Sequence, residues 1–351
     1  MGANIVRINK SFFENCQHAI WINNSLKGVP YGSLRSLEQS IIRRYNANPY
    51  CSSVSEYNPH RFAKWLGLGT NKSNLRLLIP SRHHQVKADV FWSVLMGPEN
   101  FEFDINRIRL PQKCIRILYL FDTFPSQYKL VKYMTDHFYY DLLISSFQEA
   151  LAPLSEVTER DWYFIPQAIP RVFLSDSTSR DRKFAFVSFG RKVSKVDDVI
   201  AQFCDTKKLA YVTTDQNAET GAMDELERYH NYADILNKAV FNISWGVRET
   251  NPLRSCGIDP VTARWIEASA AGNVIVGTPP VCSEFADVLP GKTVYLLNQQ
   301  SSCEAIYARL EKLWSNRDAL SSEARKYATQ YGHRLTWDSR LSQIESIAQK
   351  I

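Results

Sequence analysis

The sequence contains no long hydrophobic run. No stretch approaches the roughly 18 uncharged apolar residues that a membrane-spanning helix needs. The first residues, MGANIVRINKSFF, lack the apolar core and small-residue cleavage site of a secretory signal, and Val6 stands where a myristoylation signal has Ser or Thr. Internal repeats and low-complexity tracts are also absent. These absences favour a globular protein of the cytoplasm.

Paired cysteines are missing as well. The seven cysteines are odd in number, and none belongs to a CxxC or CxxxC pair of the kind that a disulfide framework or a structural zinc site uses. We therefore expect reduced thiols. His83 and His84 are adjacent, but no third metal ligand lies near them in the sequence, so surface histidines are the simpler interpretation. No GxSxG motif indicates a serine hydrolase, and no signature indicates a nucleic-acid partner.

Length and composition are those of an ordinary globular protein. The chain has 351 residues, 44% of them apolar and 22% charged, which is typical of about two domains. The net charge of +6 is unevenly distributed: residues 1–150 hold 18 Lys and Arg against 11 Asp and Glu, whereas the remainder is nearly neutral. This basic half suggests an anionic partner, such as a phosphate group or a membrane surface. An evenly solvated basic surface is the alternative.

Short apolar runs alternate with segments of 3.6-residue periodicity along the chain. This alternation predicts parallel strands covered by helices on both faces, and two successive sets predict two doubly wound α/β domains. The expected strands are residues 19–23, 75–79, 116–121, 142–145 and 162–165, then 184–189, 210–213, 240–244, 274–277 and 294–297. A polar segment with two prolines, residues 166–183, separates the sets. We expect domains at 1–168 and 169–333, and a last helix, 334–351, that packs back on the first domain.

One stretch has the composition of a ligand site. In DPVTARWIEASAAGNVIVGTPP, residues 259–280, an acidic residue, seven intervening residues and a Glu precede a small-residue run, a glycine and a strand. Asp259 would lie on the loop before a helix, and Glu267 about two turns inside it. The free N–H groups at a helix start favour a phosphate, and flanking carboxylates can accept paired hydrogen bonds from sugar hydroxyls. The alternative is an amphipathic helix with Glu267 facing solvent.

This stretch resembles the E-x7-E motif of retaining family 4 glycosyltransferases, which have two Rossmann-like domains facing across a cleft in the GT-B arrangement. FVSFGRKVSKVDDVIAQF, residues 186–203, is similar to that family's strand ending in Gly-Arg, followed by a Lys and a helix. The ending HRLTWDSRLSQI resembles the histidine–tryptophan–arginine signature of a branch similar to spore-maturation glycosyltransferases. YLFDTFPSQYKL, YDLLISSF and YFIPQAI resemble the acceptor-domain tail of that branch. The resemblance spans roughly residues 115–351 and leaves the first hundred residues unmatched.

The resemblance implies a donor site in the second domain. Arg191 and Lys195 would bind the donor diphosphate, although the Arg-to-Lys spacing is one residue shorter than usual and Lys192 competes for the role. Arg264, on the helix of the acidic motif, would join them in binding the substrate.

The resemblance also assigns the acidic motif and the small-residue run. Glu267 would bind the nucleotide ribose and Asp259 the hydroxyls of the donor sugar, although Asp259 replaces the commoner Glu and is one methylene shorter. The backbone N–H groups near Ala271 and Gly272 would face the phosphates.

The acceptor side departs from the family pattern. Where the family often carries a histidine beside the reacting sugar, this chain has Phe121 and Asp122. Asp122 could orient the acceptor or act as a base, or it could be a turn aspartate before Pro125. A retaining transfer does not require a protein base, because the leaving phosphate oxygen can take the acceptor proton. Gly28 and Gly32 could let the acceptor approach the backbone, or they could belong to a plain βα turn.

The implied activity is transfer of a hexose-type sugar, with retention, from a nucleoside-diphosphate sugar to a saccharide or lipid-linked saccharide, in surface glycan synthesis of bacterial type. Neither a metal nor another cofactor is expected. A catalytically silent nucleotide-sugar-binding or scaffold protein and a nucleotide-sugar epimerase are the alternatives. Aromatic residues beside basic ones also predict peripheral contact with the anionic inner face of a membrane; these pairs are Arg61-Phe62, Lys64-Trp65, Tyr128-Lys129 and Lys132-Tyr133.

Overall fold

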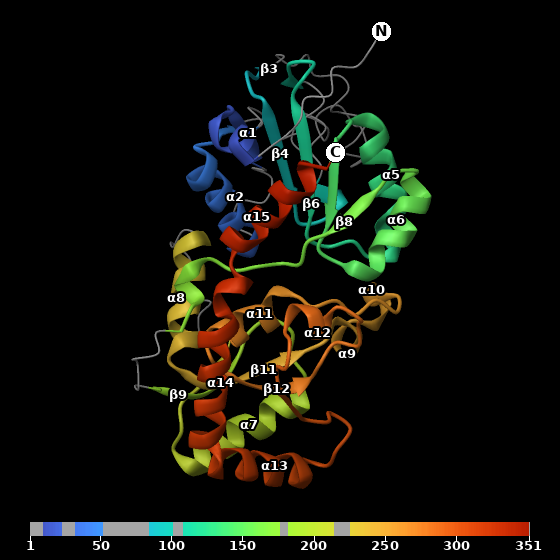
Figure 1. The fold of residues 1–351 in the computed structure, drawn as a ribbon. Coiled ribbons are helices and arrows are strands. Elements are labelled where there is room, and N and C mark those ends of the chain that lie inside the picture. Colours follow the sequence, from blue (N-terminus) through green and yellow to red (C-terminus); the bar gives the residue numbers. More distant parts are fainter. Residues whose placement is uncertain are drawn as a thin grey trace, which may run out of the picture.

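The computed structural model describes residues 10–22, 32–51, 84–100, 108–175, 182–213 and 225–350. Within them the chain forms two larger sheets, each with helices on both faces (Figure 1). All strand pairs of these sheets are parallel, as is a separate short ladder of β3 (His84–Gln85) and β5 (Ile108–Arg109). The predicted doubly wound α/β class is confirmed.

The first sheet has six strands in the order β2-β1-β4-β6-β7-β8. Successive residues of a strand enter different core clusters, as Leu118 and Tyr119 do on β6, because side chains alternate between the two faces. The strands are β1 (His18–Ile22), β2 (Asn48–Cys51), β4 (Val90–Leu95), β6 (Ile115–Leu120), β7 (Leu142–Ser145) and β8 (Trp162–Phe164). Helices α5 (Tyr128–His137) and α6 (Leu151–Thr158) cover one face, and α1 (Lys10–Asn15) and α2 (Gly32–Tyr45) cover the other.

The second sheet has five strands in the order β10-β9-β11-β12-β13. They are β9 (Phe184–Ser188), β10 (Tyr211–Thr213), β11 (Ala239–Trp245), β12 (Val274–Thr278) and β13 (Val294–Leu296). Helices α8 (Glu225–Asn237) and α11 (Ala263–Ala270) lie on one face, and α7 (Ser194–Lys207), α13 (Cys303–Ser315) and part of α14 (Arg317–Tyr331) on the other. Three one-turn helices follow the strand ends: α9 (Val247–Thr250), α10 (Pro252–Ser255) and α12 (Phe285–Val288). We call each sheet with its helices a domain.

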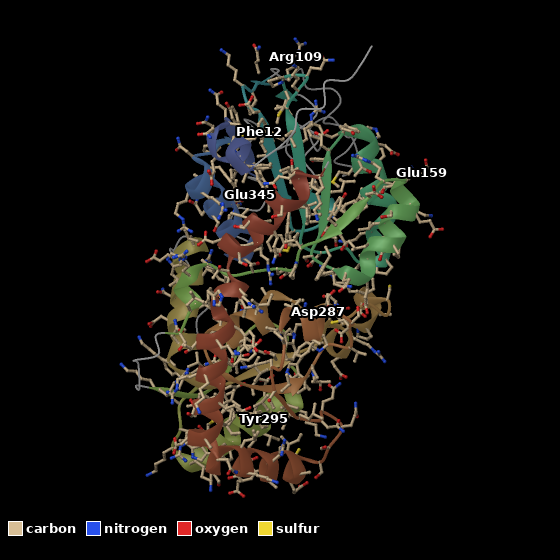
Figure 2. The ribbon with its side chains drawn as sticks, in the orientation of Figure 1. Phe12, Arg109, Glu159, Asp287, Tyr295 and Glu345 are labelled. Atoms are coloured by element: carbon tan, nitrogen blue, oxygen red, sulfur yellow. The ribbon has the colours of Figure 1, made fainter. Side chains whose placement is uncertain are left out.

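The last helix returns to the first domain. The chain crosses between the domains twice, and the two crossings pair: Ile169 and Thr336 form a parallel bridge. Helix α15 (Trp337–Ala348) then shares the core cluster of α2 and the first sheet. Glu345, labelled in Figure 2, accepts a hydrogen bond from the Tyr45 hydroxyl at 2.6 Å and pairs with Arg44 at 2.9 Å. The numerical limits of the domains stay predictions.

Short 3-10 helices occupy several connections: η3 (Pro98–Asn100), η5 (Pro125–Gln127), η6 (Gln148–Ala150), η7 (Arg171–Phe173) and η9 (Gly332–Leu335). Among the residues that the structure describes, no helix combines the length and apolar character that crossing a membrane requires.

Candidate functional site at the domain junction

The carboxyl ends of the strands of both sheets face each other where the two domains meet (Figure 1). The chain after β6 reaches α10, because Asp122 pairs with Arg254. The chain after β7 reaches the segment before α12, because the N–H of Gln148 donates to Oε2 of Glu284 at 2.8 Å. Parallel strands place their following loops along one sheet edge, where doubly wound folds bind ligands. We call this surface the domain junction.

Asp122 lies at the junction with its side chain 18% exposed, and its Oδ2 accepts a hydrogen bond from Nη2 of Arg254 at 2.6 Å. Burial raises the pKa of Asp122 to about 6, although the positive charges of Arg254 and Arg191 act to lower it. Asp122 is not the cap of η5, since Phe124 occupies that position. A carboxyl group that titrates near neutral pH has the property that acid–base roles require.

Three arginines come together at the junction, and we call Arg191, Arg254 and Arg264 the arginine cluster. Nη1 of Arg191 lies 3.4 Å from Oγ1 of Thr262, which is the N-cap residue of α11. Burial lowers the pKa of Arg191, and the charges of Arg264 and Arg254 act in the same direction, while Asp122 opposes them. Arg254 is paired with Asp122, so an anion would bind between Arg191 and Arg264 and relieve their mutual repulsion.

Glu267 lies on α11 and is only 2% exposed, so the solvent-facing alternative is wrong. Its Oε1 accepts a hydrogen bond from the Tyr229 hydroxyl at 2.7 Å, and its Oε2 lies 3.4 Å from Nη1 of Arg264. The Arg264 guanidinium also sits over the Tyr232 ring, 4.7 Å from its centre. Gly190, with φ of +84°, makes room for it, because a Cβ there would lie 3.1 Å from Nε of Arg264. Hydrogen bonds to two partners compensate the burial of the carboxylate.

Asp259 is 1% exposed and holds two loops together. Its Oδ1 accepts from the backbone N–H of Arg248 at 3.1 Å, after β11, and its Oδ2 from that of Val281 at 3.0 Å, after β12. Gly246 packs against it so closely that a Cβ would lie 2.7 Å from Oδ2. In this arrangement Asp259 positions the loops of the junction, and its contact with a donor sugar stays a prediction.

Among the described residues, no contact joins Lys195 to the arginine cluster. Its Nζ donates to the carbonyl of Ser301 at 2.5 Å, in the loop before α13. Gly28 lies outside the described residues, so its expected proximity to the acceptor stays a prediction.

Ala271 and Gly272 follow the last turn of α11, at the opposite end of the helix from Thr262. Their N–H groups donate to carbonyls within that last turn, at 3.0 and 3.2 Å. The prediction that these N–H groups face the phosphates is therefore corrected, because a helix presents free N–H groups at its start and not at its end. Gly272 has φ of +68°, which suits it to ending the helix.

Four polar residues of the junction were not predicted. They are Gln167, Tyr229, Arg254 and Glu284, and each connects segments that are far apart in sequence. Gln167, for example, accepts the N–H of Ala263 at the start of α11 at 2.8 Å. Gln167 stands in YFIPQAI, one of the segments that resemble the spore-maturation branch, whereas the other three stand in no recognisable motif and only the fold could reveal them.

The described part of the chain brings no three His, Cys, Asp or Glu side chains together in a metal-binding group. A cavity of about 290 Å³ lies elsewhere, beside the start of β12 and β13 and against α14. Tyr295, labelled in Figure 2, lines it together with Lys292, whose pKa burial lowers to about 8. Because parallel strands begin at the opposite edge from the junction, this cavity is separate from the candidate site.

No protein-family model matches the sequence, and no curated protein is similar to it in sequence. Among solved structures, Alr3699/HepE from Anabaena, determined in complex with UDP-glucose, is similar with a TM-score of 0.58 at 10% identity, over 96% of this chain and 100% of HepE. A glycosyltransferase from Rickettsia africae ESF-5 has a TM-score of 0.49 at 9% identity, over 95% and 98% of the two chains.

The pneumococcal O-GlcNAc transferase GtfA, determined with UDP and GlcNAc, has a TM-score of 0.43 at 12% identity, over 74% of this chain. The matched part is 56% of GtfA, so this chain corresponds to little more than half of that protein. At such identities a structural similarity shows the fold alone, and the similarity to HepE is the one that supports the fold assignment. The fold is the GT-B arrangement of two Rossmann-like domains.

Proposed function

We propose that the protein is a glycosyltransferase that moves a sugar from a nucleoside-diphosphate sugar to a saccharide or lipid-linked saccharide acceptor. Arg191 and Arg264 beside the buried Glu267, at the start of α11, are the observation that carries this proposal. It lies at the carboxyl edge of the second sheet, where doubly wound domains bind nucleotides. The resemblance to family 4 and to the spore-maturation branch supports the same assignment.

In the proposed donor complex, Arg191 and Arg264 bind the diphosphate and Glu267 accepts hydrogen bonds from the ribose. Each oxygen of Glu267 has a second lone pair beyond its contact with Tyr229 or Arg264. Asp122, on the facing edge, accepts a hydrogen bond from a hydroxyl of the acceptor in this complex. If the transfer proceeds with retention, the leaving phosphate oxygen takes the proton of the reacting hydroxyl, and Asp122 orients the acceptor through a neighbouring hydroxyl.

The finer assignments are a hexosyltransferase, a retaining outcome and a role in surface glycan synthesis of bacterial type. We further propose a location in the cytoplasm, with peripheral contact at the inner face of the membrane, where a lipid-linked acceptor is presented. Incubation with a panel of nucleotide sugars distinguishes a glycosyltransferase from the two alternatives, a nucleotide-sugar epimerase and a catalytically silent binding or scaffold protein. Transfer or donor hydrolysis indicates a transferase, a changed sugar on an intact nucleotide indicates an epimerase, and binding alone indicates a silent protein.

The donor site is tested by calorimetry with nucleoside diphosphates on Arg191→Ala and on the Arg191→Ala, Glu267→Ala double variant. Loss of one charge-assisted phosphate contact is worth roughly 1.5–3 kcal/mol, which predicts about ten- to hundredfold weaker binding by Arg191→Ala. Lys207→Ala is the matched control, because Lys207 pairs with Glu311 at the far end of α7. Unchanged nucleotide binding by a folded double variant would place the donor site elsewhere.

Transfer is also expected to survive a chelator, because the proposed diphosphate ligands are arginines and not a metal. The measurement is the initial rate of donor turnover before and after EDTA, with Mg²⁺ and Mn²⁺ added back. Abolition by EDTA and recovery with either ion would contradict this expectation.

A further inference from the structure

The ion pair between Arg254 and Asp122 connects the two facing domains across the domain junction. The residues are 132 positions apart in sequence, and Nη2 of Arg254 lies 2.6 Å from Oδ2 of Asp122. The Arg254 guanidinium also lies over the Phe124 ring, 4.8 Å from its centre, so it contacts the first domain through two residues. Arg254 stands in none of the sequence motifs of the chain, and the proposed diphosphate ligands are Arg191 and Arg264.

The segment that carries Arg254 is held in place on both sides. Asn251 caps α10, its side chain accepting the N–H of Arg254 at 3.1 Å. The buried Ser255 hydroxyl donates to the carbonyl of Ile258 at 2.8 Å. Val247 and Ile258, which flank α10, belong to the core cluster of the first domain. The backbone that presents Arg254 is therefore fixed against the domain that carries Asp122.

The charges around Asp122 come from three further segments. Arg254 reaches it from α10 and Arg191 from the loop after β9, and both favour the carboxylate, whereas Glu99 on η3 disfavours it. Burial at the domain junction favours the protonated form and outweighs the two arginines. The second domain thus supplies the charges that keep this carboxylate from being protonated more fully.

We propose that Arg254 is a positioning residue that ionises and orients Asp122 when the two domains are in contact. Arg254 donates to Oδ2 of Asp122 and leaves Oδ1 to accept a hydrogen bond from an acceptor hydroxyl. Within the described residues, no donor is hydrogen-bonded to Oδ1. A carboxylate offers both oxygens as acceptors, whereas a protonated carboxyl group carries an O–H donor on one of them. Domain contact therefore assembles the acceptor side of the site. This inference rests on the proposed function, in which Asp122 faces the acceptor.

The direct test is the pKa of Asp122, followed by NMR in protein with ¹³C-labelled aspartate carboxyl groups and assigned with Asp122→Asn. The wild-type midpoint is expected at about 6. Arg254→Met is expected to raise it by on the order of one unit, and Arg254→Lys by less, because Lys keeps the charge. Arg171→Met is the matched control, since Arg171 forms an exposed pair with Asp338 at 2.8 Å away from Asp122. An unchanged midpoint in folded Arg254→Met overturns the inference.

A second readout separates this inference from the proposed function. With any donor that the wild type turns over, the acidic limb of the kcat/KM profile is expected to move to higher pH in Arg254→Met, while nucleotide binding stays within about twofold of wild type. A loss of nucleotide binding like that of Arg191→Ala, with the Asp122 midpoint unchanged, would make Arg254 a donor ligand and overturn the positioning role. If the wild type turns over no donor, the proposed function fails, whereas the NMR midpoints still decide whether Arg254 controls Asp122.

Discussion

Glu267 shows how this fold accommodates a buried charge beside its candidate donor site. The carboxylate is almost fully enclosed, with the Tyr229 hydroxyl on one oxygen and Arg264 near the other. Burial, followed by the neighbouring negative charge of Glu267, raises the pKa of Tyr229, so its hydroxyl remains a donor. Tyr229 also packs against Gly32 of the first domain, where a Cβ would lie 2.4 Å from its ring. One side chain therefore links Glu267 to the contact between the domains.

Tyr229→Phe is expected to destabilise the protein and to weaken nucleotide binding. Removing the hydroxyl leaves Oε1 of Glu267 without its donor, which costs about 1.5–3 kcal/mol for a buried charged acceptor. Urea unfolding and calorimetry with nucleoside diphosphates measure the two effects. Tyr139→Phe is the control, because Tyr139 is 58% exposed. Equal stability of Tyr229→Phe and wild type would show that the hydrogen bond contributes nothing net.

The pairing of β11 and β12 supports the second half of the junction. Ser244 lies opposite Gly277 and Trp245 opposite Thr278, and the loops after both strands are the ones that Asp259 joins. At Gly277 the backbone has φ of +146°, and a Cβ would lie 1.9 Å from the carbonyl oxygen of Ser244. No side chain can be accommodated there without separating the two strands.

Gly277→Ala is therefore expected to lower the free energy of unfolding by about 3 kcal/mol or more. Gly291→Ala provides the comparison, because Gly291 also has positive φ, +68°, but a Cβ there meets nothing within 4 Å. Its expected cost is only the backbone strain, about 1–2 kcal/mol. Urea unfolding of both variants separates close approach from strain. Equal losses in the two variants would mean that the strands separate at little cost.

Across the whole molecule, the uneven distribution of charge favours the first domain as the acceptor side. Helix α5 exposes Leu130 and Tyr133, 38% and 45% accessible, next to Lys129 and Lys132. Lys132 also lies 3.5 Å from Asp136 on the same helix. The other pairs that predict a membrane contact, at residues 61–65, lie outside the described residues. The first domain is thus the part of the molecule expected to contact an anionic surface.

Cosedimentation with anionic vesicles at low salt, but not at high salt, is the expected result, since each Lys or Arg near the surface contributes about 1 kcal/mol. A Lys129→Glu, Leu130→Ser double variant is expected to bind several-fold more weakly. Leu296→Ser serves as the control, because Leu296 is 61% exposed on the second domain. Failure of the wild type to bind even at low salt removes the membrane from the proposal and leaves the donor site unaffected.

Most of the sheet architecture was predictable from local pattern. Buried parallel strands are continuous apolar runs, so the expected strands that lie within the described residues each coincide with a strand of the structure. The expected strand at 75–79 lies outside them. Two strands of the first sheet were missed. VFWSVL of β4 has the apolar signal that could have identified it, whereas NPYC of β2 is a mostly exposed edge strand containing proline and has no such signal.

The candidate site was predictable only where a motif carried it. Arg191 and Glu267 stand in such motifs, and the structure places both around the start of α11. The motif also suggested Ala271 and Gly272 as phosphate ligands, but their N–H groups donate to carbonyls in the last turn of α11. The spacing of the motif does not reveal at which residue this helix ends.

By itself, the sequence determined the two parallel sheets and the helix that presents Glu267, because strand and helix periodicity is local. Only the tertiary structure decided which edges of the sheets meet. The contacts of Asp122 with Arg254, of Tyr229 with Glu267 and of Gln148 with Glu284 join residues that are 38 to 136 positions apart. The first and last of these pairs arise because parallel topology brings the strand ends of two domains to one surface, whereas Tyr229 and Glu267 lie on two helices of the second domain. No local pattern encodes which side chains then face each other.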